Sequence, residues 1–358
     1  PSSAAYEPQD AVEKGLWLEM DEAERQIRAS KFLIEDAELN AYVKAVLCRT
    51  VGADKCSSAR IYLIRTPQFN AAMAPNGMML VWSGLLLRAR NEAELATVLG
   101  HEFAHFEAQH SLQSFRDIKA KSDAITWLGF VPGGLLAQIG LMGSVFRFNR
   151  EMEKRADMAA LDYLGASGYD PMAASQIWEQ FRGEMEAAKA GNATVLSEES
   201  ASFFSSHPNS KDRMEYLRAA ARRKAPSADN GAERYRAAIG RWWPRLIDDQ
   251  VKLNDFAATE YLLAGMARGE WSADLLYARA ELYRARGKGG DVVSAERFYR
   301  QSVTLDPGLA ESWKGLGLVL LRQGKAMEGR RMLRRYLDLA PEASDRAMIA
   351  AMAAEAKP

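Results

Sequence analysis

Cysteine and histidine are both scarce in this chain, with two cysteines and four histidines among 358 residues. Two cysteines cannot cross-link a small disulfide-rich fold. Without a second cysteine pair or a nearby histidine, they do not complete a zinc knuckle either. Cys48 and Cys56 stand eight positions apart. They could pair with each other or remain separate half-buried thiols, and the sequence leaves both readings open.

The chain also lacks an excess of either charge, since 47 Lys and Arg residues balance 47 Asp and Glu residues. A surface that binds nucleic acid usually appears as a basic excess or cluster, so the balance predicts no nucleic-acid partner. Hydrophobic residues make up 48% of the sequence, which is ordinary for a folded protein. The length exceeds what one core usually supports, and we therefore expect two domains.

A long uncharged run spans residues 124–146 and is long enough to cross a bilayer. A Val-Pro-Gly-Gly interruption and further glycines favour a buried or interfacial helical hairpin instead. A true membrane span and a lid that touches lipid are the alternatives, and the run also predicts peripheral membrane contact. The chain opens without a basic or apolar leader, so any secretory signal is expected to have been removed.

The N-terminal half predicts helices followed by a small sheet. Residues 7–50 carry apolar side chains at three- and four-residue spacings, which is typical of helices. Residues 59–66 are rich in β-branched and aromatic side chains and predict a strand. A Pro-Asn-Gly turn precedes Met78–Trp82, which predicts a second strand at the edge of the sheet.

The C-terminal part contains a repeat of 34 residues, the distance between Pro307 and Pro341. A small residue precedes each proline by twelve positions, and a large residue precedes it by eight. These residues are Ala295 and Gly329, and Tyr299 and Leu333. The pattern resembles the tetratricopeptide repeat. A weaker copy covers 235–266, and we expect the two clear copies to pack on it or on the first domain.

Three of the four histidines lie in one run, NEAELATVLGHEFAHFEAQH, at 91–110. His101 and His105 are four residues apart in a predicted helix capped by Asn91, so both imidazoles leave the same face and can meet one metal ion. In the pattern H-E-x-x-H, Glu102 is the general base beside a metal-held water. A catalytic zinc needs a third protein ligand, which must come from elsewhere.

The run NEAELATVLGHEFAH, followed by NREMEKRAD, resembles the HtpX-type family of zinc endopeptidases, which includes the CAAX-prenyl endoproteases. The resemblance covers about residues 30–220. It implies one Zn²⁺ per chain, with Glu153 as the third ligand after the two histidines. Asp157 shares the helical face of Glu153 and could accept a hydrogen bond from a ligand histidine. Arg155 stands where the family commonly has a second Glu, and we expect that position to lie outside the ligand shell.

The segment NAAMAPNGMMLVWSGLL also resembles the family, in its stretch before the active-site helix. The resemblance implies an edge strand to which a substrate peptide adds as a further strand, with broad specificity. The residues of this predicted substrate-binding edge are Asn70, Ala71, Pro75, Gly77 and Met78.

The remaining histidine, His207, lies in SSHPNSKDR, with Arg213 six residues later. This pair matches a further family feature and brings the resemblance closest to periplasmic, repeat-bearing BepA-like members, which act in outer-membrane protein quality control. His207 could reach the zinc and take the place of the water, or donate to the oxyanion alongside Arg213. A local hydrogen bond at a helix start is the third reading. His110 has no such partner pattern, and we expect it at the surface.

The predicted fold class is an α+β zincin-like metalloprotease domain, mostly helical with a small sheet, followed by an all-α tetratricopeptide-repeat domain. The predicted divisions are an N-terminal helical extension (1–30), the protease domain (31–222), a linker (223–233) and the repeats (234–358).

The predicted function is zinc-dependent cleavage of unfolded or misassembled proteins in the periplasm, by attack of a metal-activated water. The repeats would recruit substrate or a partner complex. Membrane association through 124–146 is a further expectation. Two rivals are a protease-fold adaptor or chaperone with latent or no turnover, and an integral membrane protease.

Overall fold

The computed structural model describes residues 6–121, 148–191, 207, 211–224, 227 and 229–354. The run 124–146, with its predictions of a hairpin or a membrane contact, lies outside these residues. The chain divides into two compact units, Pro1–Arg182 with Leu196–Leu246, and Gly183–Val195 with Ile247–Pro358. Within the described residues, no helix combines the length and the apolar character needed to span a bilayer.

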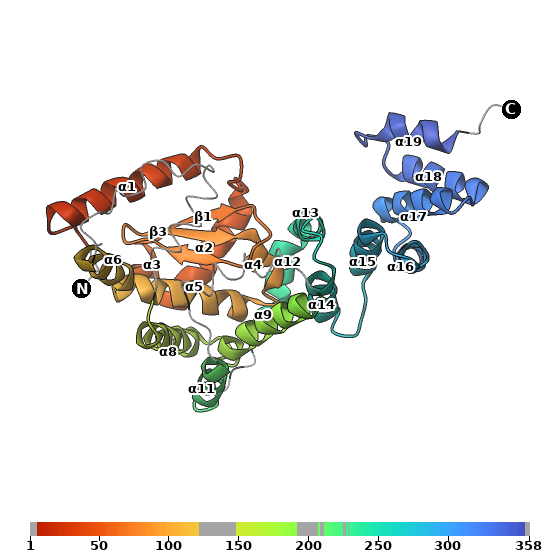
Figure 1. Ribbon diagram of the computed structural model, residues 1–358. Helices are drawn as coiled ribbons and strands as arrows, with labels where there is room; N and C mark the ends of the chain where they lie inside the picture. The colour runs from red at the N-terminus through yellow and green to blue at the C-terminus, as the bar shows by residue number, and fades with distance from the viewer. Residues whose placement is uncertain are drawn as a thin grey trace. The chain divides into compact units, whose positions relative to one another are not determined.

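The first unit is mostly helical and contains one small sheet (Figure 1). Its elements up to the sheet are α1 (Ala11–Arg28), α2 (Ala37–Val51), α3 (Ala53–Cys56), β1 (Arg60–Ile64), β2 (Ala71–Met73) and β3 (Met78–Trp82). After the sheet come α4 (Ser83–Arg88), α5 (Glu92–Glu107), α6 (His110–Lys121), α8 (Arg150–Ser167), α9 (Ala173–Ala190), α11 (Lys211–Ala221), α12 (Ala232–Ile239) and the 3₁₀ turn η1 (Gly240–Trp242). The part of α9 from Gly183 onward belongs to the second unit.

The sheet has the strand order β1-β3-β2, with β1 parallel and β2 antiparallel to β3. The prediction that Met78–Trp82 forms an edge strand is therefore wrong, because β3 is the central strand. All five of its residues are buried, so both faces of the strand are covered. The edge next to α5 is the three-residue strand β2, which α5 contacts directly.

The faces of the sheet are covered by helices whose apolar sides follow the helical period. Leu16, Met20 and Ile27 of α1 pack against Met78 and Trp82 of β3 and are almost fully buried. Burying side chains of this size contributes roughly 1.5–3 kcal/mol each. In Figure 1, α1 lies on one side of the sheet, while α5 and α8 lie on the other. This second layer carries the buried histidine and glutamate side chains His101, His105 and Glu153.

A disulfide joins Cys48 to Cys56 and settles the question that the sequence left open. The chain turns between α2 and α3 at Gly52, whose φ of 95° favours glycine. The two Cα atoms lie 5.0 Å apart, and the Lys44 ammonium donates to the Cys56 and Ala59 carbonyls beside the bridge. The bridge therefore ties the end of α2 to the segment that leads into β1.

The first unit extends beyond the linker that the sequence places at 223–233, since it continues to Leu246. The polar residues of this stretch are bonded to the first unit. The Asn230 carbonyl accepts from the backbone N–H of Ala93 at 3.0 Å, and Arg49 pairs with Asp229 at 2.8 Å. The Tyr235 hydroxyl of α12 donates to the Leu86 carbonyl at 2.5 Å. Helix α12 is consequently part of this unit.

The second unit is all-helical in its described residues, and Figure 1 shows its helices following one another as antiparallel pairs. Its elements, including one that begins in the first unit, are α13 (Trp243–Val251), α14 (Phe256–Ala267), α15 (Ala273–Arg286), α16 (Asp291–Leu305), α17 (Ala310–Arg322), α18 (Ala326–Leu339) and α19 (Arg346–Ala353). Helices α15 with α16, and α17 with α18, are the two pairs of the 34-residue repeat.

Small residues stand where the paired helices approach most closely. A Cβ atom on Gly317 of α17 would lie 2.6 Å from Leu333 Cδ2 and 2.9 Å from the Gly329 carbonyl oxygen of α18. Ala280 and Ala295 of the preceding pair have no exposed surface. The alternation of small and large residues in the sequence therefore reflects this helix packing, and a helical repeat follows the first unit in the chain.

Candidate metal centre

Helix α5 supplies three polar side chains to the interior of the first unit. It begins at Glu92, where the Asn91 side chain accepts from the Glu94 backbone N–H at 2.8 Å, as the N-cap prediction requires. The helix packs against α2, α8 and β2. As a result, His101, Glu102 and His105 are 0%, 2% and 1% exposed. Polar groups removed from water in this way need partners inside the protein.

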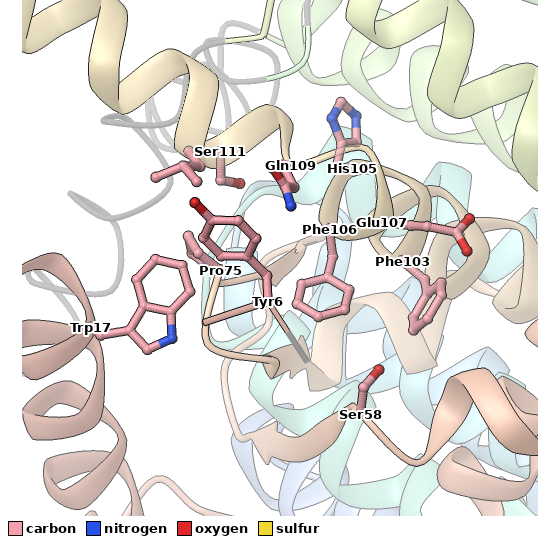
Figure 2. A pocket seen from close by; sticks show the side chains of 11 residues that line it. Tyr6, Trp17, Ser58, Pro75, Phe103, His105, Phe106, Glu107, Gln109 and Ser111 are labelled. Atoms are coloured by element: carbon pink, nitrogen blue, oxygen red, sulfur yellow. The ribbon is translucent and has the colours of Figure 1, made fainter. Parts of the chain in front are cut away.

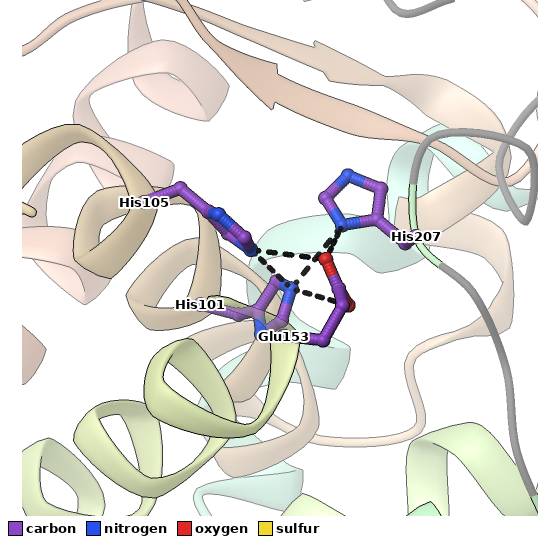
Figure 3. A group of neighbouring side chains, drawn as sticks. All are labelled: His101, His105, Glu153 and His207. Carbon is purple, nitrogen blue, oxygen red and sulfur yellow. Dashed lines mark hydrogen bonds and ion pairs between the residues drawn. The ribbon is translucent and has the colours of Figure 1, made fainter. Parts of the chain in front are cut away.

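Helix α8 supplies the partners from the opposite side. Asn149 caps its first turn, which places Glu153 and Asp157 one turn apart on the face toward α5. His207 reaches the same point from outside the helices. Ligand atoms of His101, His105, Glu153 and His207 all lie within 4.8 Å of one another (Figure 3).

The distances within this cluster suit a small tetrahedral cation. His101 Nε2 lies 3.1 Å from His105 Nε2 and 3.4 Å from His207 Nδ1. Glu153 oxygens lie 3.6 Å from His101 Nε2, 3.3 Å from His105 Nε2 and 2.9 Å from His207 Nδ1. A tetrahedral ion with nitrogen and oxygen ligands at about 2.0–2.1 Å separates those ligands by roughly 3.3 Å. The four side chains therefore fit a metal ion.

The second nitrogen of His101 is held by a carboxylate. Its Nδ1 lies 3.0 Å from Asp157 Oδ1. Asp157 in turn accepts from Arg213 Nε at 2.7 Å and Nη2 at 2.6 Å, and also from the Tyr216 hydroxyl. A proton on Nδ1 leaves the lone pair of Nε2 directed at the cluster. This is the usual arrangement around a histidine that binds metal.

The second nitrogen of His105 faces His110, with 3.0 Å between the two Nδ1 atoms. His110 has no exposed surface, so the expectation that it lies at the surface is wrong. After α5 the chain reverses at Gln109, which has a φ of 54°, and α6 begins at His110. The reversal turns the His110 ring back onto His105. The Phe148 ring stacks on the His105 ring, with centroids 3.8 Å apart.

The cluster attracts positive charge. Burial lowers the pKa of His101, but hydrogen bonds to Asp157 and Glu153 outweigh it and raise the pKa to about 9. Burial pushes the pKa of Glu153 upward, yet the surrounding histidines hold it well below its ordinary value. Asp157 behaves likewise, because Arg213 outweighs burial and lowers its pKa. A bound cation would replace the proton that these carboxylates keep on His101.

The Glu102 carboxylate lies beside the cluster but contributes no ligand atom to it. Its Oε1 is buried and accepts no hydrogen bond from the described residues, and it lies 3.7 Å from His207 Nε2. Burial raises the pKa of this carboxyl group. A carboxylate that is poorly solvated takes up a proton readily, which is the property a general base needs.

Residues 34–221 match the sequence model of peptidase family M48. This match covers more than half of the chain. The chain belongs to peptidase family M48.

Two groups of M48 relatives resemble this chain. The mitochondrial metalloendopeptidase OMA1 of Schizosaccharomyces pombe is 33% identical over 179 residues, which are 48% of this chain and 50% of the relative. The beta-barrel assembly-enhancing protease of Escherichia coli K12 is 25% identical over 302 residues, which are 80% of this chain and 58% of the relative. The chain thus spans only half to three-fifths of these relatives. They support a metalloprotease and the BepA-like resemblance.

Among solved structures, yeast Tom70 aligns with 96% of this chain and 74% of its own, at 12% identity and a TM-score of 0.28. A score this low carries no argument about the fold.

His207 lies in the cluster, and Arg213 lies behind it, next to Asp157. The Arg213 side chain is buried, with its Nε and Nη2 bonded to Asp157 and its Nη1 3.2 Å from Glu153 Oε2. Its guanidinium carbon lies 4.1 Å from the centre of the Trp178 ring. Arg213 therefore holds Asp157, the carboxylate that contacts the second nitrogen of His101.

The predicted substrate edge lies on β2 and the turn that follows it. Asn70 precedes the strand, Ala71 opens it, and Met78 opens β3. The Trp82 N–H donates to the Asn70 carbonyl and the Ala74 N–H donates to the Met78 carbonyl. Because backbone bonds alternate along a strand, the polar groups of Ala71 point away from β3.

The turn between these strands requires glycine at position 77. Gly77 has a φ of 89°, and a Cβ atom there would lie 2.4 Å from the Ser58 carbonyl oxygen. Pro75 and Gly77 therefore shape the turn that brings β2 beside β3.

An apolar pocket of about 110 Å³ lies behind the cluster of His101, His105, Glu153 and His207 (Figure 2). Tyr6 and Trp17 close it on one side, and the rings of Phe103 and Phe106 on the other. In Figure 2 the His105 imidazole points away from it. The pocket is thus separated from the cluster by the body of α5, and Pro75 of the strand turn also lines it.

Proposed function

We propose that this chain is a zinc-dependent endopeptidase that cleaves unfolded or misassembled proteins. The observation that carries the proposal is the convergence of His101 and His105 from α5 with Glu153 from α8. The second nitrogens of both histidines are held, which supports metal binding rather than a chance cluster. Two nitrogens and one carboxylate oxygen form a ligand set that zinc takes in hydrolases.

A zinc ion held there would acidify a water molecule and polarise a peptide carbonyl. Glu102 would accept a proton on Oε1 from the attacking water and pass it to the leaving amine nitrogen. Its burial and the lack of a hydrogen bond to that oxygen in the described residues support this role. Asp157 and Arg213 would keep the His101 ring in the productive tautomer.

Substrate would pair with the outer edge of β2, next to which the described residues place no further strand, once the cover over the buried Ala71 has moved. The outward-facing backbone groups of Ala71 offer hydrogen bonds that do not depend on the substrate side chains. Such pairing selects extended chains, and unfolded or misassembled proteins provide them. Broad specificity follows from the same feature.

His207 supports a closed resting state. Its Nδ1 lies with the three ligand atoms of His101, His105 and Glu153, and so would fill the fourth position that a water needs. This favours the latch over the oxyanion donor. It is also the one observation that favours the rival function, an adaptor with latent turnover.

We place this activity in the periplasm, with the helical repeats, of tetratricopeptide type, recruiting substrate or a partner complex. The Cys48–Cys56 disulfide supports an oxidising compartment. The relatives named as beta-barrel assembly-enhancing proteases support a role in the cell envelope.

The deciding experiment uses Glu102→Gln and His207→Ala. The first variant should keep about one zinc per chain and lose cleavage of a chemically unfolded test protein. Cleavage at the parent rate would disprove the mechanism. The second should cleave faster than the parent if His207 is a latch, and more slowly if it donates to the oxyanion. Zinc without turnover in both parent and His207→Ala would favour the adaptor.

A further inference from the structure

The helical repeats carry two adjacent hollows lined by arginine. The first, about 580 Å³, lies along α15 and α16 and includes Arg297, Arg300 and Leu305. The second, about 480 Å³, lies on α18 and consists of Met327, Glu328, Arg330, Arg331 and Arg334. Arg300 of the first hollow pairs with Glu328 of the second at 2.7 Å, which makes them neighbours. We call the residues of both hollows the arginine face.

Most of the cations on this face are not neutralised. Arg297, Arg330, Arg331 and Arg334 form no salt bridge within the part of the chain that the structure describes. The carboxylate of the second hollow, Glu328, is already occupied by Arg300. Unpaired guanidinium groups gathered on one surface create a positive potential that attracts anions.

The same face exposes apolar side chains beside the arginines. Met327 is 86% exposed and Leu305 is 60% exposed. In the first hollow, the guanidinium carbon of Arg279 lies 4.4 Å from the centre of the Trp271 ring, so one wall is aromatic. A ligand that satisfies this face needs both negative charge and bulky apolar groups.

We propose that the arginine face is a docking surface for an acidic protein segment that carries bulky apolar side chains. Guanidinium groups match carboxylates through paired, parallel hydrogen bonds, which a Glu- or Asp-rich segment supplies. The aromatic wall formed by Trp271 lies in the first hollow, where an inserted side chain can reach it. This inference deepens the proposed recruiting role of the repeats and is independent of the metal chemistry.

The test measures binding of a fluorescein-labelled peptide of repeated Glu-Glu-Phe units by anisotropy. The protein is the full chain with Glu102→Gln, so that cleavage does not interfere. Reversing Arg330 and Arg334 together to Glu should weaken binding about tenfold, because each reversal removes an attraction and adds a repulsion. Met327→Asp should also weaken binding, because it removes an apolar contact.

The matched control reverses Arg223 and Arg322, two exposed arginines outside the face. It changes the net charge equally and should bind as the parent does. Equal weakening in the control, or parent-like binding by the double reversal on the face, would overturn the proposal.

Phosphatidylglycerol vesicles that bind through Arg330 and Arg334, when the peptide does not, would overturn it in favour of a membrane. The same reversals are also made in the chain that keeps Glu102, and its cleavage of an unfolded test protein is measured. This measurement separates a failed docking surface from a failed peptidase.

Discussion

Replacing His110 with Phe tests how the metal ligands are oriented. When His105 directs Nε2 at the cluster, its proton lies on Nδ1 and must find an acceptor. His110 Nδ1 lies 3.0 Å away and is that acceptor. Burial, with help from Arg155, lowers the pKa of His110 to about 4. The ring is therefore uncharged at neutral pH, and its Nδ1 can accept.

Phenylalanine keeps an aromatic ring in the same space but cannot accept this hydrogen bond. A buried N–H without an acceptor costs about 1–3 kcal/mol. Loss of a partner that orients a ligand histidine typically weakens metal binding about tenfold to a hundredfold. We therefore expect the zinc affinity of His110→Phe to fall by that factor, with a smaller fall in thermal stability in the metal-free form.

The measurement is competition for zinc with a chromophoric chelator at neutral pH. His110→Gln is the informative companion, because its amide oxygen can accept from His105 and should restore part of the affinity. Gln113→Ala on the exposed side of the same helix is the control and should bind zinc normally. Unchanged affinity in His110→Phe would show that His105 does not need this partner.

Three further outcomes follow from the packing and the charges. Burial raises the pKa of Glu24, but hydrogen bonds and charge from Arg60 outweigh burial and lower the pKa from 4.5 to about 2. The ionised Glu24 therefore stabilises the folded protein by about 2 kcal/mol after allowance for solvent. This stabilisation is full above about pH 4.5 and is lost as the pH falls toward 2. In urea unfolding, the difference between the parent and Glu24→Gln should shrink over that interval, and a constant difference would refute the assignment. Gly317→Ala should destabilise the repeats by about 1–3 kcal/mol, because its Cβ would meet Leu333 at 2.6 Å. Gly15→Ala, whose Cβ would have no atom within 4 Å, should be neutral or stabilising when both variants are measured by urea unfolding.

The helical ligand spacing was accessible from the sequence, because a four-residue interval in a helix brings two side chains onto one face. The resemblance supplied Glu153, since nothing local says which acidic residue of a charged helix turns inward. The position of His110 was not accessible. It depends on a left-handed residue, Gln109, at a place where no glycine or proline announces a turn. Three histidines within ten residues were the available signal.

The order of strands was also hidden. Periodicity indicates that Met78–Trp82 is a strand, but it does not tell which neighbours the strand has. Its antiparallel partner β2 has three residues, too few to produce an alternating pattern. The polar composition of 223–233 indicated a linker for a similar reason, since composition does not show that Asp229 is paired with Arg49.

The anchoring of α5 from downstream decides where the catalytic part of the chain can be cut. Arg234 holds Glu92 at 2.7 Å, and the Asn230 carbonyl accepts from the Ala93 N–H. The first turn of the helix that carries His101 and His105 is therefore bonded to residues 8 and 12 positions beyond residue 222. A fragment stopped at residue 222 would expose that turn and the Leu86 carbonyl under Tyr235. A fragment carried through Leu246 keeps both, and is the one to express when the peptidase is to be studied without its repeats.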